Sequence, residues 1–505
     1  MSGSFRNTGS TLSNLLAGFC EVPPHLDRHI SDITIDSRET MQGSCFFALS
    51  GSTRRGSDFI SDAVCRGATA VVSETQFPLN PPSKVAFLVV PKLKDLIGKI
   101  SSRFFGDPSK LLKIYAVTGT NGKTTVSYLI SRIIGILDGS CGYLGTLGIG
   151  LDNSREMLET SNTTPDTITI NRALSKFLMD GATSCSLEAS SIGLSQGRLD
   201  GLDLDTALYT NLGQDHLDYH GSQDAYELAK LSLFKRKDVR NVILNLDDEF
   251  GRTISKEIYA DKNVLSVAVG SEILGGGRPD ISVSNIRCSL GYSRFSLAYQ
   301  GKILDLKTQL IGGFNVSNVS LSVGALLAAG YSSESIMRFL PEIGCIPGRM
   351  QFCGESSSGA FVFVDYAHTP EGLGAALSAF RALSKERVIV VFGCGGDRDR
   401  TKRSKMGSVA SLGSDLIFLT GDNSRSEATE DIVEEILMGI EDRERVLTIY
   451  DRLSAIKAAI SSARSGDIVL IAGKGHETVQ EINGKKSEHN DFLSVRKILS
   501  EGGYD

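Results

Sequence analysis

The chain has 505 residues, more than one hydrophobic core normally supports, so at least two domains are expected. Apolar residues make up 41% and charged residues 22%, as in soluble globular proteins, and 53 Gly against 12 Pro excludes a collagen-like or Pro/Gly-rich disordered chain. The net charge of −6 argues against a nucleic-acid partner, and no run of 18 apolar residues predicts a membrane span.

The nine Cys are scattered and form no Cys-x-x-Cys motif, which indicates free thiols in a reducing cytoplasm. The first 20 residues are rich in Ser but contain one Arg and a weak apolar core, which is unlike a targeting signal. We therefore expect a cytoplasmic protein, acting as a monomer.

Residues 1–112 predict a small α/β domain. The short apolar runs Cys45–Leu49, Ala68–Ser73 and Val85–Val90 are typical of buried strands, and the helix-like segment Asp58–Arg66 lies between the first two. A Pro-containing segment, Gly106–Lys110, interrupts the pattern before the next section begins.

The next section, residues 113–345, opens on a strand that leads into Gly-Thr-Asn-Gly-Lys-Thr-Thr at 119–125, followed by the helix-like segment Val126–Leu137. Such a loop brings backbone N–H groups to phosphate oxygens at a helix start; Lys123 would contact the β and γ phosphates and Thr124 a Mg²⁺ ion. The general phosphate-loop pattern has Gly where Val117 stands, so a glycine-rich turn with an unrelated lysine is the alternative. Strand, loop and helix in this order favour a parallel sheet that binds a nucleotide.

Polar residues follow two later strand candidates of this section. Glu188 ends an apolar stretch, and two Asp and two His lie within the six residues Asp215–His220, just after the strand candidate Thr206–Thr210. A carboxylate and imidazoles at strand ends suit a metal-nucleotide site. A solvated loop, or a helix cap in the case of Glu188, is the alternative interpretation.

The last section, residues 346–505, repeats the alternation of strands and helices. This pattern predicts a second doubly wound, Rossmann-like domain. Its strand candidates are Val362–Val364, Val388–Phe392, Leu416–Leu419 and Ile468–Ala472, and its helix candidates include Thr429–Met438 and Leu453–Ala463.

Taken together, these motifs resemble those of the Mur ligases, the ATP-dependent amino-acid ligases of peptidoglycan synthesis. The family's phosphate loop reads Thr-Gly-Thr-Asn-Gly-Lys-Thr, as residues 118–124 do here, which accounts for Val117. The match runs from Asp36-Ser37-Arg38 to the Gly-Lys-Gly-His-Glu segment at 473–477. The resemblance implies an α/β protein of three domains: a UDP-binding domain (1–112), a central ATPase domain with a parallel sheet (113–345) and a C-terminal Rossmann-like domain (346–505).

The resemblance also implies roles for individual residues. Catalysis would rest on Lys123, Glu188, His216 and Lys230, and Mg²⁺ on Thr124, Glu188, His216 and Lys230, the lysine being carbamylated so that it carries a negative charge. By spacing alone Lys230 would be a surface lysine of a helix. The implied ATP contacts are Gly119, Thr120, Asn121, Gly122, Lys123, Thr124, Thr125, Asn315, Arg349, Asp365 and His368.

On the substrate side, the resemblance implies a UDP-muramoyl dipeptide as partner. The implied contacts are Ile35, Ser37, Asn162, Thr163, Thr164, Ser190, Gln196 and Arg198. Two places depart from the family pattern: Ile192 stands where His is common, and Ser52-Thr53-Arg54 differs from the usual segment.

The implied contacts to the incoming amino acid are Arg398, Asp422, Asn423, Ser424, Arg425, Gly473 and Glu477. The family motif Asp-Asn-Pro-Arg accompanies meso-diaminopimelate, and here Ser424 replaces the proline while Asn423 and Arg425 are kept. Two Arg and one Glu suit an amino acid whose far end is a zwitterion, because Arg binds its carboxylate and Glu its ammonium.

The chain most resembles the family members that add the third peptide residue to UDP-N-acetylmuramoyl-L-alanyl-D-glutamate. The implied reaction joins meso-diaminopimelate to the D-glutamate γ-carboxylate through an acyl phosphate, with ATP as co-substrate and Mg²⁺ as cofactor. A sibling ligase that adds lysine or acts on another acid, such as a folate polyglutamate ligase, is one alternative. A P-loop kinase or hydrolase, or a non-catalytic nucleotide-binding regulator, is an alternative of a different class.

Overall fold

The computed structural model describes residues 10–51, 55–76, 84–152, 157–160, 162–258, 261–270 and 278–501. The segment Ser52-Thr53-Arg54, which departs from the family pattern, lies outside the described residues. The chain divides into two compact units: the first comprises residues 1–116, 134–207 and 235–240, and the second residues 117–133, 208–234 and 241–505.

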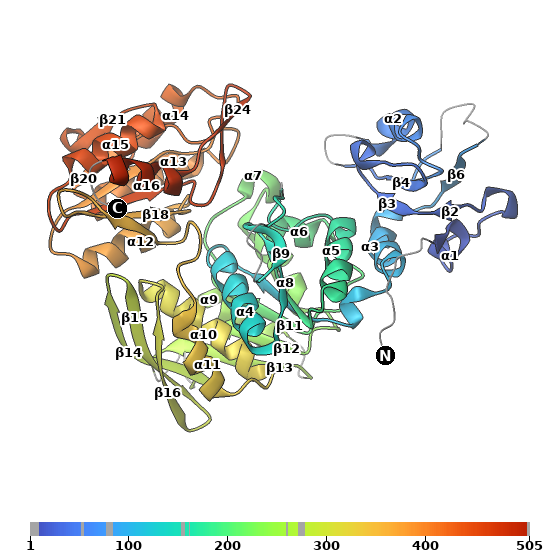
Figure 1. Cartoon of the computed structure of the whole chain (residues 1–505), viewed down its shortest axis with the longest axis horizontal. Helices are drawn as coiled ribbons and strands as arrows, with labels where there is room; N and C mark the ends of the chain where they lie inside the picture. Colours follow the sequence, from blue (N-terminus) through green and yellow to red (C-terminus); the bar gives the residue numbers. More distant parts are fainter. Residues whose placement is uncertain are drawn as a thin grey trace. The chain divides into compact units, whose positions relative to one another are not determined.

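The first unit contains a four-stranded parallel sheet in the order β3-β4-β5-β6. Its strands bury both faces because helices cover both (Figure 1): Cys45 and Phe47 pack toward α3, and Phe46 and Ala48 toward α2. Strands covered on both sides read as continuous apolar runs, which is how the sequence predicts them. The elements here are β1 (Ser10–Thr11), α1 (Leu12–Leu16), β2 (His29–Ile30), β3 (Asp32–Thr34), β4 (Ser44–Ala48), α2 (Ile60–Cys65), β5 (Ala70–Ser73), β6 (Ala86–Val89) and α3 (Leu93–Phe104).

A ten-stranded sheet has the order β16-β15-β14-β13-β12-β11-β7-β10-β8-β9. The pairs β8–β10, β12–β13 and β13–β14 are parallel, and β9, β15 and β16 pair antiparallel at the two edges. Its strands are β7 (Lys113–Thr118), β8 (Cys141–Gly145), β9 (Gly148–Leu151), β10 (Ser184–Glu188), β11 (Thr206–Tyr209), β12 (Asn241–Asn245), β13 (Asn263–Val269), β14 (Ile281–Ser289), β15 (Tyr292–Tyr299) and β16 (Lys302–Thr308).

The helices between these strands begin where the chain supplies capping side chains. Asp166 accepts from two N–H groups at the start of α5, and Asp248 does the same for α9. The helix predicted at Val126–Leu137 begins three residues earlier, at Lys123, directly after the phosphate loop. The helices are α4 (Lys123–Asp138), α5 (Thr167–Met179), α6 (Ser191–Ser195), α7 (Leu217–His220), α8 (Gln223–Phe234), α9 (Glu249–Glu257), α10 (Gly313–Ala328) and α11 (Ser333–Phe339).

The last part of the second unit is a six-stranded sheet in the order β17-β18-β22-β19-β20-β21, parallel except for β17. Alternate residues of β19 belong to two separate hydrophobic clusters, one under α12, α13 and α14 and one under α15 and α16. This is the Rossmann-like arrangement that the sequence predicts. The elements are β17 (Gln351–Glu355), β18 (Phe361–Asp365), α12 (Pro370–Leu383), β19 (Val388–Phe392), α13 (Thr401–Gly413), β20 (Leu416–Leu419), α14 (Thr429–Leu437), β21 (Val446–Thr448), α15 (Arg452–Ser462), β22 (Ile468–Ala472), β23 (Val479–Ile482), β24 (Lys485–Glu488) and α16 (Asp491–Glu501).

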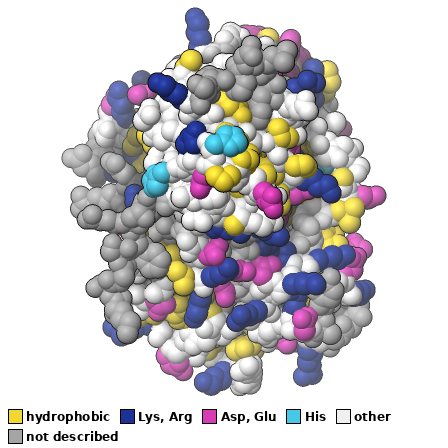
Figure 2. All heavy atoms as spheres, turned by 90° about the vertical axis from the view of Figure 1, so that its right-hand side faces the viewer, with side chains coloured by type: hydrophobic (Ala, Val, Ile, Leu, Met, Phe, Trp, Pro, Cys, Tyr) yellow, Lys and Arg dark blue, Asp and Glu magenta, His cyan; other side chains and the backbone are white. Residues whose placement is uncertain are grey.

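Figure 2 shows one face on which Lys, Arg, Asp and Glu side chains are interspersed below a group of hydrophobic side chains. No helix within the described residues is long and apolar enough to cross a bilayer. All nine Cys are free; Cys65 and Cys345 are exposed, and five others are buried.

Candidate active site

The phosphate loop follows β7 and is shaped by two glycines in the left-handed region. A Cβ at Gly119, where φ is +147°, would lie 1.8 Å from Thr210 Oγ1, and one at Gly122, where φ is +89°, would lie 2.4 Å from Asn318 Oδ1. Only glycine therefore fits at these two positions. Lys123 Nζ turns back onto the loop and donates to the carbonyls of Gly119 and Thr120, at 3.0 and 2.9 Å.

A cavity of about 440 Å³ lies beside this loop, entirely within the second unit. It brings together eight of the eleven predicted ATP contacts: Asn121, Gly122, Thr124, Thr125, Asn315, Arg349, Asp365 and His368. Gly119, Thr120 and Lys123 do not line it. Several further lining residues were not predicted, among them Asn211, Asn245, Asp247, Phe314, Asn318 and Tyr366. Asn318 stands in the same Gly-Phe-Asn-Val-Ser-Asn segment as Asn315, and this repeat of amides on one helix was a usable signal.

Arg349 connects the cavity wall to the phosphate loop. Its Nη2 donates to Thr124 Oγ1 at 2.8 Å, and its guanidinium lies 4.5 Å from the centre of the Tyr366 ring. Its buried Nε has no hydrogen-bond partner among the described residues. A planar cation held in this way suits the phosphates or base of a nucleotide.

Two titratable groups of the cavity are shifted by burial. Burial raises the pKa of Asp365, whose two oxygens accept from the backbone N–H groups of Met350 and Ala367. Burial, together with the charge of Lys402, lowers the pKa of His368 to about 4, so this imidazole is neutral at pH 7. His368 therefore lines the cavity without adding a positive charge.

Lys230 is fully buried on α8, contrary to what its spacing alone indicates. Its Nζ donates to the Gly119 carbonyl at 2.8 Å and lies 4.3 Å from the centre of the Tyr226 ring. No carboxylate forms an ion pair with it among the described residues. Burial, and next the charge of Lys123, lowers the pKa of Lys230 well below its ordinary value. An amine of this kind is the form that can add CO₂ and become an anionic carbamate.

His216 begins the short helix α7 in a left-handed conformation, with φ at +53°. Its backbone N–H and its Nε2 both face Asp215, at 2.9 and 3.5 Å from the two carboxylate oxygens. Burial lowers the pKa of His216 although the Asp215 charge opposes this shift, and the charge of Lys123 lowers it further, which favours a neutral imidazole. Burial alone would raise the pKa of Asp215, but the charges of His216, His368 and Lys402 lower it to about 2.

Glu188 ends β10 in the first unit and is 1% exposed. Its Oε1 accepts from the Tyr143 hydroxyl at 2.7 Å and from the Thr146 backbone N–H at 2.8 Å, and its Oε2 accepts from Thr146 Oγ1 at 3.1 Å. The interpretation of Glu188 as a solvated side chain is therefore wrong. A buried carboxylate fixed by three donors is instead held in one orientation.

Mg²⁺ prefers oxygen ligands. Within the described residues no three His, Cys, Asp or Glu side chains cluster as a ready metal site. Thr124 and Glu188 offer a hydroxyl and a carboxylate, whereas the buried amine of Lys230 cannot bind a cation unless it is carbamylated. Within the second unit, Thr124 and a carbamylated Lys230 would thus fit a Mg²⁺ ion that takes its other ligands from the nucleotide and water.

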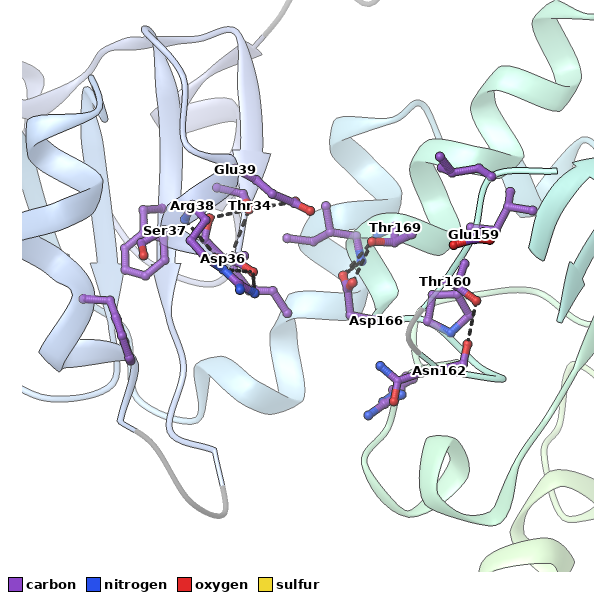
Figure 3. A pocket seen from close by; sticks show the side chains of 18 of the residues that line it. Thr34, Asp36, Ser37, Arg38, Glu39, Glu159, Thr160, Asn162, Asp166 and Thr169 are labelled. Atoms are coloured by element: carbon purple, nitrogen blue, oxygen red, sulfur yellow. Dashed lines mark hydrogen bonds and ion pairs between the residues drawn. The ribbon is translucent and has the colours of Figure 1, made fainter. Parts of the chain in front are cut away.

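A second cavity, of about 790 Å³, lies within the first unit. Figure 3 shows Asp36, Ser37 and Arg38 on one side and Glu159, Thr160 and Asn162 on the other, with Asp166 and Thr169 at the start of α5 between them. Four of the eight predicted substrate contacts line it: Ile35, Ser37, Asn162 and Arg198. Asp36 accepts from both the backbone and the guanidinium of Arg38, so it holds the turn that carries Ser37.

The remaining predicted substrate residues form a network behind this cavity. Thr164 Oγ1 donates to the Glu188 carbonyl at 2.6 Å and accepts from the backbone N–H of Ser190 at 2.9 Å. Arg198 donates to the Thr164 carbonyl at 2.5 Å and, through two nitrogens, to Gln196 Oε1. Thr163 Oγ1 accepts from Thr146 at 3.2 Å. The network ties the substrate cavity to the carboxylate at the end of β10.

The predicted amino-acid contacts meet on three loops of the six-stranded sheet. Arg425, with φ at +52°, donates to the Gly396 carbonyl at 2.7 Å, and a Cβ on Gly395 would lie 3.0 Å from Arg425 Nη1 and 3.8 Å from Arg398 Cγ. The other predicted residues are Asp422, Asn423, Ser424, Gly473 and Glu477; Asn423 Nδ2 donates to Glu477 Oε2 at 2.9 Å, and a Cβ on Gly473 would lie 2.7 Å from Asp422 Oδ2.

The fold and the site define a phosphate-loop α/β protein in which a nucleotide cavity, a second ligand cavity and a Rossmann-like sheet occur in one chain. Comparison with known proteins identifies the family to which this class of protein belongs. Residues 117–326 match the Mur ligase middle domain, residues 348–475 the Mur ligase glutamate ligase domain, and residues 29–105 the catalytic domain of the family. The chain belongs to the Mur ligase family and is an ADP-forming amide ligase.

Two relatives carry the name UDP-N-acetylmuramoyl-L-alanyl-D-glutamate--2,6-diaminopimelate ligase. The protein of Ectopseudomonas mendocina is 38% identical over 475 residues, 93% of this chain and 95% of the relative. The protein of Aquifex aeolicus is 39% identical over 476 residues, 94% of this chain and 95% of the relative.

Two solved structures resemble the chain over almost its full length. A structure bearing the same ligase name is 34% identical, has a TM-score of 0.68 and is matched over 98% of this chain and 100% of its own. The MurF ligase of Thermotoga maritima in complex with ADP is 17% identical, with a TM-score of 0.64 and coverage of 95% and 99%. The second likeness supports the fold alone.

Proposed function

We propose that the protein joins meso-diaminopimelate to the D-glutamate γ-carboxylate of UDP-N-acetylmuramoyl-L-alanyl-D-glutamate, with cleavage of ATP to ADP and phosphate, in peptidoglycan synthesis. The names of the relatives support this substrate pair. We further propose domain borders near residues 112 and 345 and a monomeric enzyme of the cytoplasm.

A carboxylate is a poor electrophile and must be activated before an amine can attack it. In the proposed first step the γ-carboxylate attacks the γ-phosphate of ATP, which yields an acyl phosphate and ADP. The phosphate loop would hold the nucleotide, with Lys123 exchanging its two carbonyl partners for phosphate oxygens. Positioning and charge neutralisation carry most of the catalysis in phosphoryl transfer.

Mg²⁺, held by Thr124, Glu188, His216 and carbamylated Lys230, would neutralise the charge that develops on the phosphates. The chain contributes the orientation of these groups. Tyr143 and Thr146 fix the Glu188 carboxylate, Asp215 faces the imidazole of His216, and burial lowers the pKa of Lys230, which favours the uncharged amine that adds CO₂.

In the proposed second step the uncharged amine of diaminopimelate attacks the acyl carbon, and inorganic phosphate leaves. Arg398 and Arg425 would bind the distal carboxylate, with Glu477 on the distal ammonium. Water must be excluded during this step, because it would hydrolyse the acyl phosphate.

The observation that carries the choice of amino acid is that the loop with Asn423 and Arg425 meets the loop with Glu477, where Asn423 donates to Glu477. Lysine has no distal carboxylate, so it would leave Arg425 without a ligand partner in the site. Ser424, which replaces the proline of the motif, is 1% exposed and leaves the backbone hydrogen bonds of both neighbours in place.

The test is a ligation assay with purified enzyme, ATP, Mg²⁺ and the UDP-dipeptide, offering meso-diaminopimelate, L-lysine or L-glutamate in parallel. We expect phosphate release and product with meso-diaminopimelate, at a kcat/KM at least about tenfold above that for lysine, which corresponds to one lost charged hydrogen bond. A preference for lysine would refute the assignment of the amino acid. Phosphate release at the same rate with and without an added amino acid would refute the assignment as a ligase.

A further inference from the structure

The Lys474 side chain is a buried cation that none of the roles above uses. It lies in the loop after β22, its side chain is 0% exposed, and it cannot reach a ligand from there. Ammonium groups have three N–H donors. Nζ of Lys474 has three acceptors: Asn423 Oδ1 at 3.0 Å, Glu477 Oε2 at 2.7 Å and the Val479 carbonyl at 2.9 Å.

Two of these acceptors belong to side chains that the proposed function places on the amino acid. Asn423 Oδ1 accepts a second hydrogen bond from the Glu481 backbone N–H at 3.0 Å. With both donors on the oxygen, the amide has one orientation, and Nδ2 points at Glu477 Oε2, 2.9 Å away.

The same arrangement fixes the carboxylate. Oε2 of Glu477 accepts from both Lys474 and Asn423, whereas Oε1 accepts from no described residue. The Glu477 side chain is 30% exposed, so Oε1 is the oxygen available to an incoming cation. One N–H of Asn423 remains as a donor beside it. The outward face of the loop is therefore one donor next to one anionic acceptor.

We propose that Lys474 is the positioning residue for amino-acid recognition: it orients Asn423 and Glu477 so that an N–H donor and a carboxylate oxygen together face the ammonium and carboxylate of a zwitterion. The proposal rests on the proposed function in that it takes these two residues as the amino-acid site. Without the ammonium, Glu477 would be free to turn and Asn423 to flip, and the paired donor and acceptor would be lost.

The test compares Lys474→Met and Lys474→Gln with the wild-type enzyme in steady-state kinetics. We expect the KM for the amino acid to rise roughly 10- to 100-fold, the range for removing an outer partner that orients a site residue. The KM values for ATP and the UDP-dipeptide should stay within about twofold. The Lys474→Gln variant keeps one N–H donor toward Glu477, so it provides a second measurement if the Lys474→Met variant fails to fold.

Arg387→Met is the matched control, because Arg387 pairs with the buried Asp467 at the opposite end of the same strand β22. We expect the Arg387→Met variant to be less stable than the wild type but to have the same KM for the amino acid. If all three KM values rise together in the Lys474 variants, or the KM for the amino acid does not change, the positioning role is refuted.

A crystal structure of Lys474→Met separates this proposal from the proposed function. Asn423 or Glu477 should be reoriented relative to the wild type, whichever amino acid the enzyme uses. Unchanged side chains would overturn the positioning role, whereas failure of the wild-type enzyme with meso-diaminopimelate would overturn only the proposed function.

Discussion

At the scale of single residues, burial separates functional side chains from ordinary ones. Lys230 would be a solvated lysine by its spacing, yet its amine lies against the Gly119 carbonyl with no ion-pair partner among the described residues. Burying a lysine without an ion-pair partner lowers the stability of the folded protein, which indicates that Lys230 has a function that offsets this loss. Carbamylation supplies one, since it replaces a buried amine with a metal-binding anion.

Replacing Lys230 with Ala should therefore lower kcat by roughly 100- to 1000-fold, the effect of removing one electrostatic group from an active site. A short carboxylic acid added to the assay should restore part of the activity by filling the space of the carbamate. Lys237→Ala, an exposed lysine just beyond the same helix, should behave as the wild type. An active Lys230→Ala enzyme would contradict the carbamate.

Eight of the eleven predicted ATP contacts line one cavity, but the residues that surround and orient the site were mostly not predicted. The phosphate loop and Arg349 could be predicted because motif and order along the chain identify them. The roles of Tyr143 and Thr146 at Glu188 could not, because β8 and β10 become neighbours only in the folded sheet. Lys474 was also missed as a functional residue, since nothing in the sequence says that its ammonium is buried.

At the scale of secondary-structure elements, many buried parallel strands were predicted, whereas the antiparallel edges and the parallel strands β8 and β13 were not. Strands such as β19 and β22 read as continuous apolar runs because helices cover both of their faces. The hairpin β15–β16 exposes one face, and polar residues such as Lys302 and Asp305 lie on its strands. These strands therefore contain no continuous apolar run from which they could be predicted.

Helix α5 gives a prediction at this scale, because its N-cap Asp166 also lines the larger cavity. Asp166→Ala should lower the free energy of unfolding by about 1 kcal/mol, through loss of the cap, and should raise the KM for the UDP-dipeptide. Urea unfolding and steady-state kinetics measure the two effects. Asp451→Ala, which removes the N-cap of α15, should lower stability similarly with no change in that KM. Equal KM changes in both variants would contradict a role for α5 in this cavity.

At the scale of the whole molecule, one buried ion pair should govern behaviour in acid. Arg452 and Asp491 are both 0% exposed and bonded through two oxygens, and His489 adds a third contact. Burial alone would raise the pKa of Asp491, but the charge and hydrogen bonds of Arg452 hold it well below its ordinary range. The unfolded chain therefore takes up this proton at a higher pH than the folded chain does.

The stability that this pair provides is complete above the ordinary carboxyl pKa of about 4 and is lost as the pH falls toward the lowered value. Asp491→Asn should cost roughly 3–5 kcal/mol at pH 7, because it leaves Arg452 unpaired. Its free energy of unfolding should also fall less steeply between about pH 4 and pH 2 than that of the wild type. Exposed Asp180→Asn is the control; parallel pH curves for Asp491→Asn and the wild type would contradict this account.

The free thiols have a practical consequence. Thiolates are the reactive form of Cys, and burial raises the pKa of Cys394 to about 12 and also raises that of Cys45 and Cys353. The two exposed thiols, Cys65 and Cys345, belong to different units. Cys20 and Cys288 are partly exposed, so Cys20→Ser and Cys288→Ser would restrict labelling to this pair. Energy transfer between fluorophores on Cys65 and Cys345 could then follow the distance between the units during turnover.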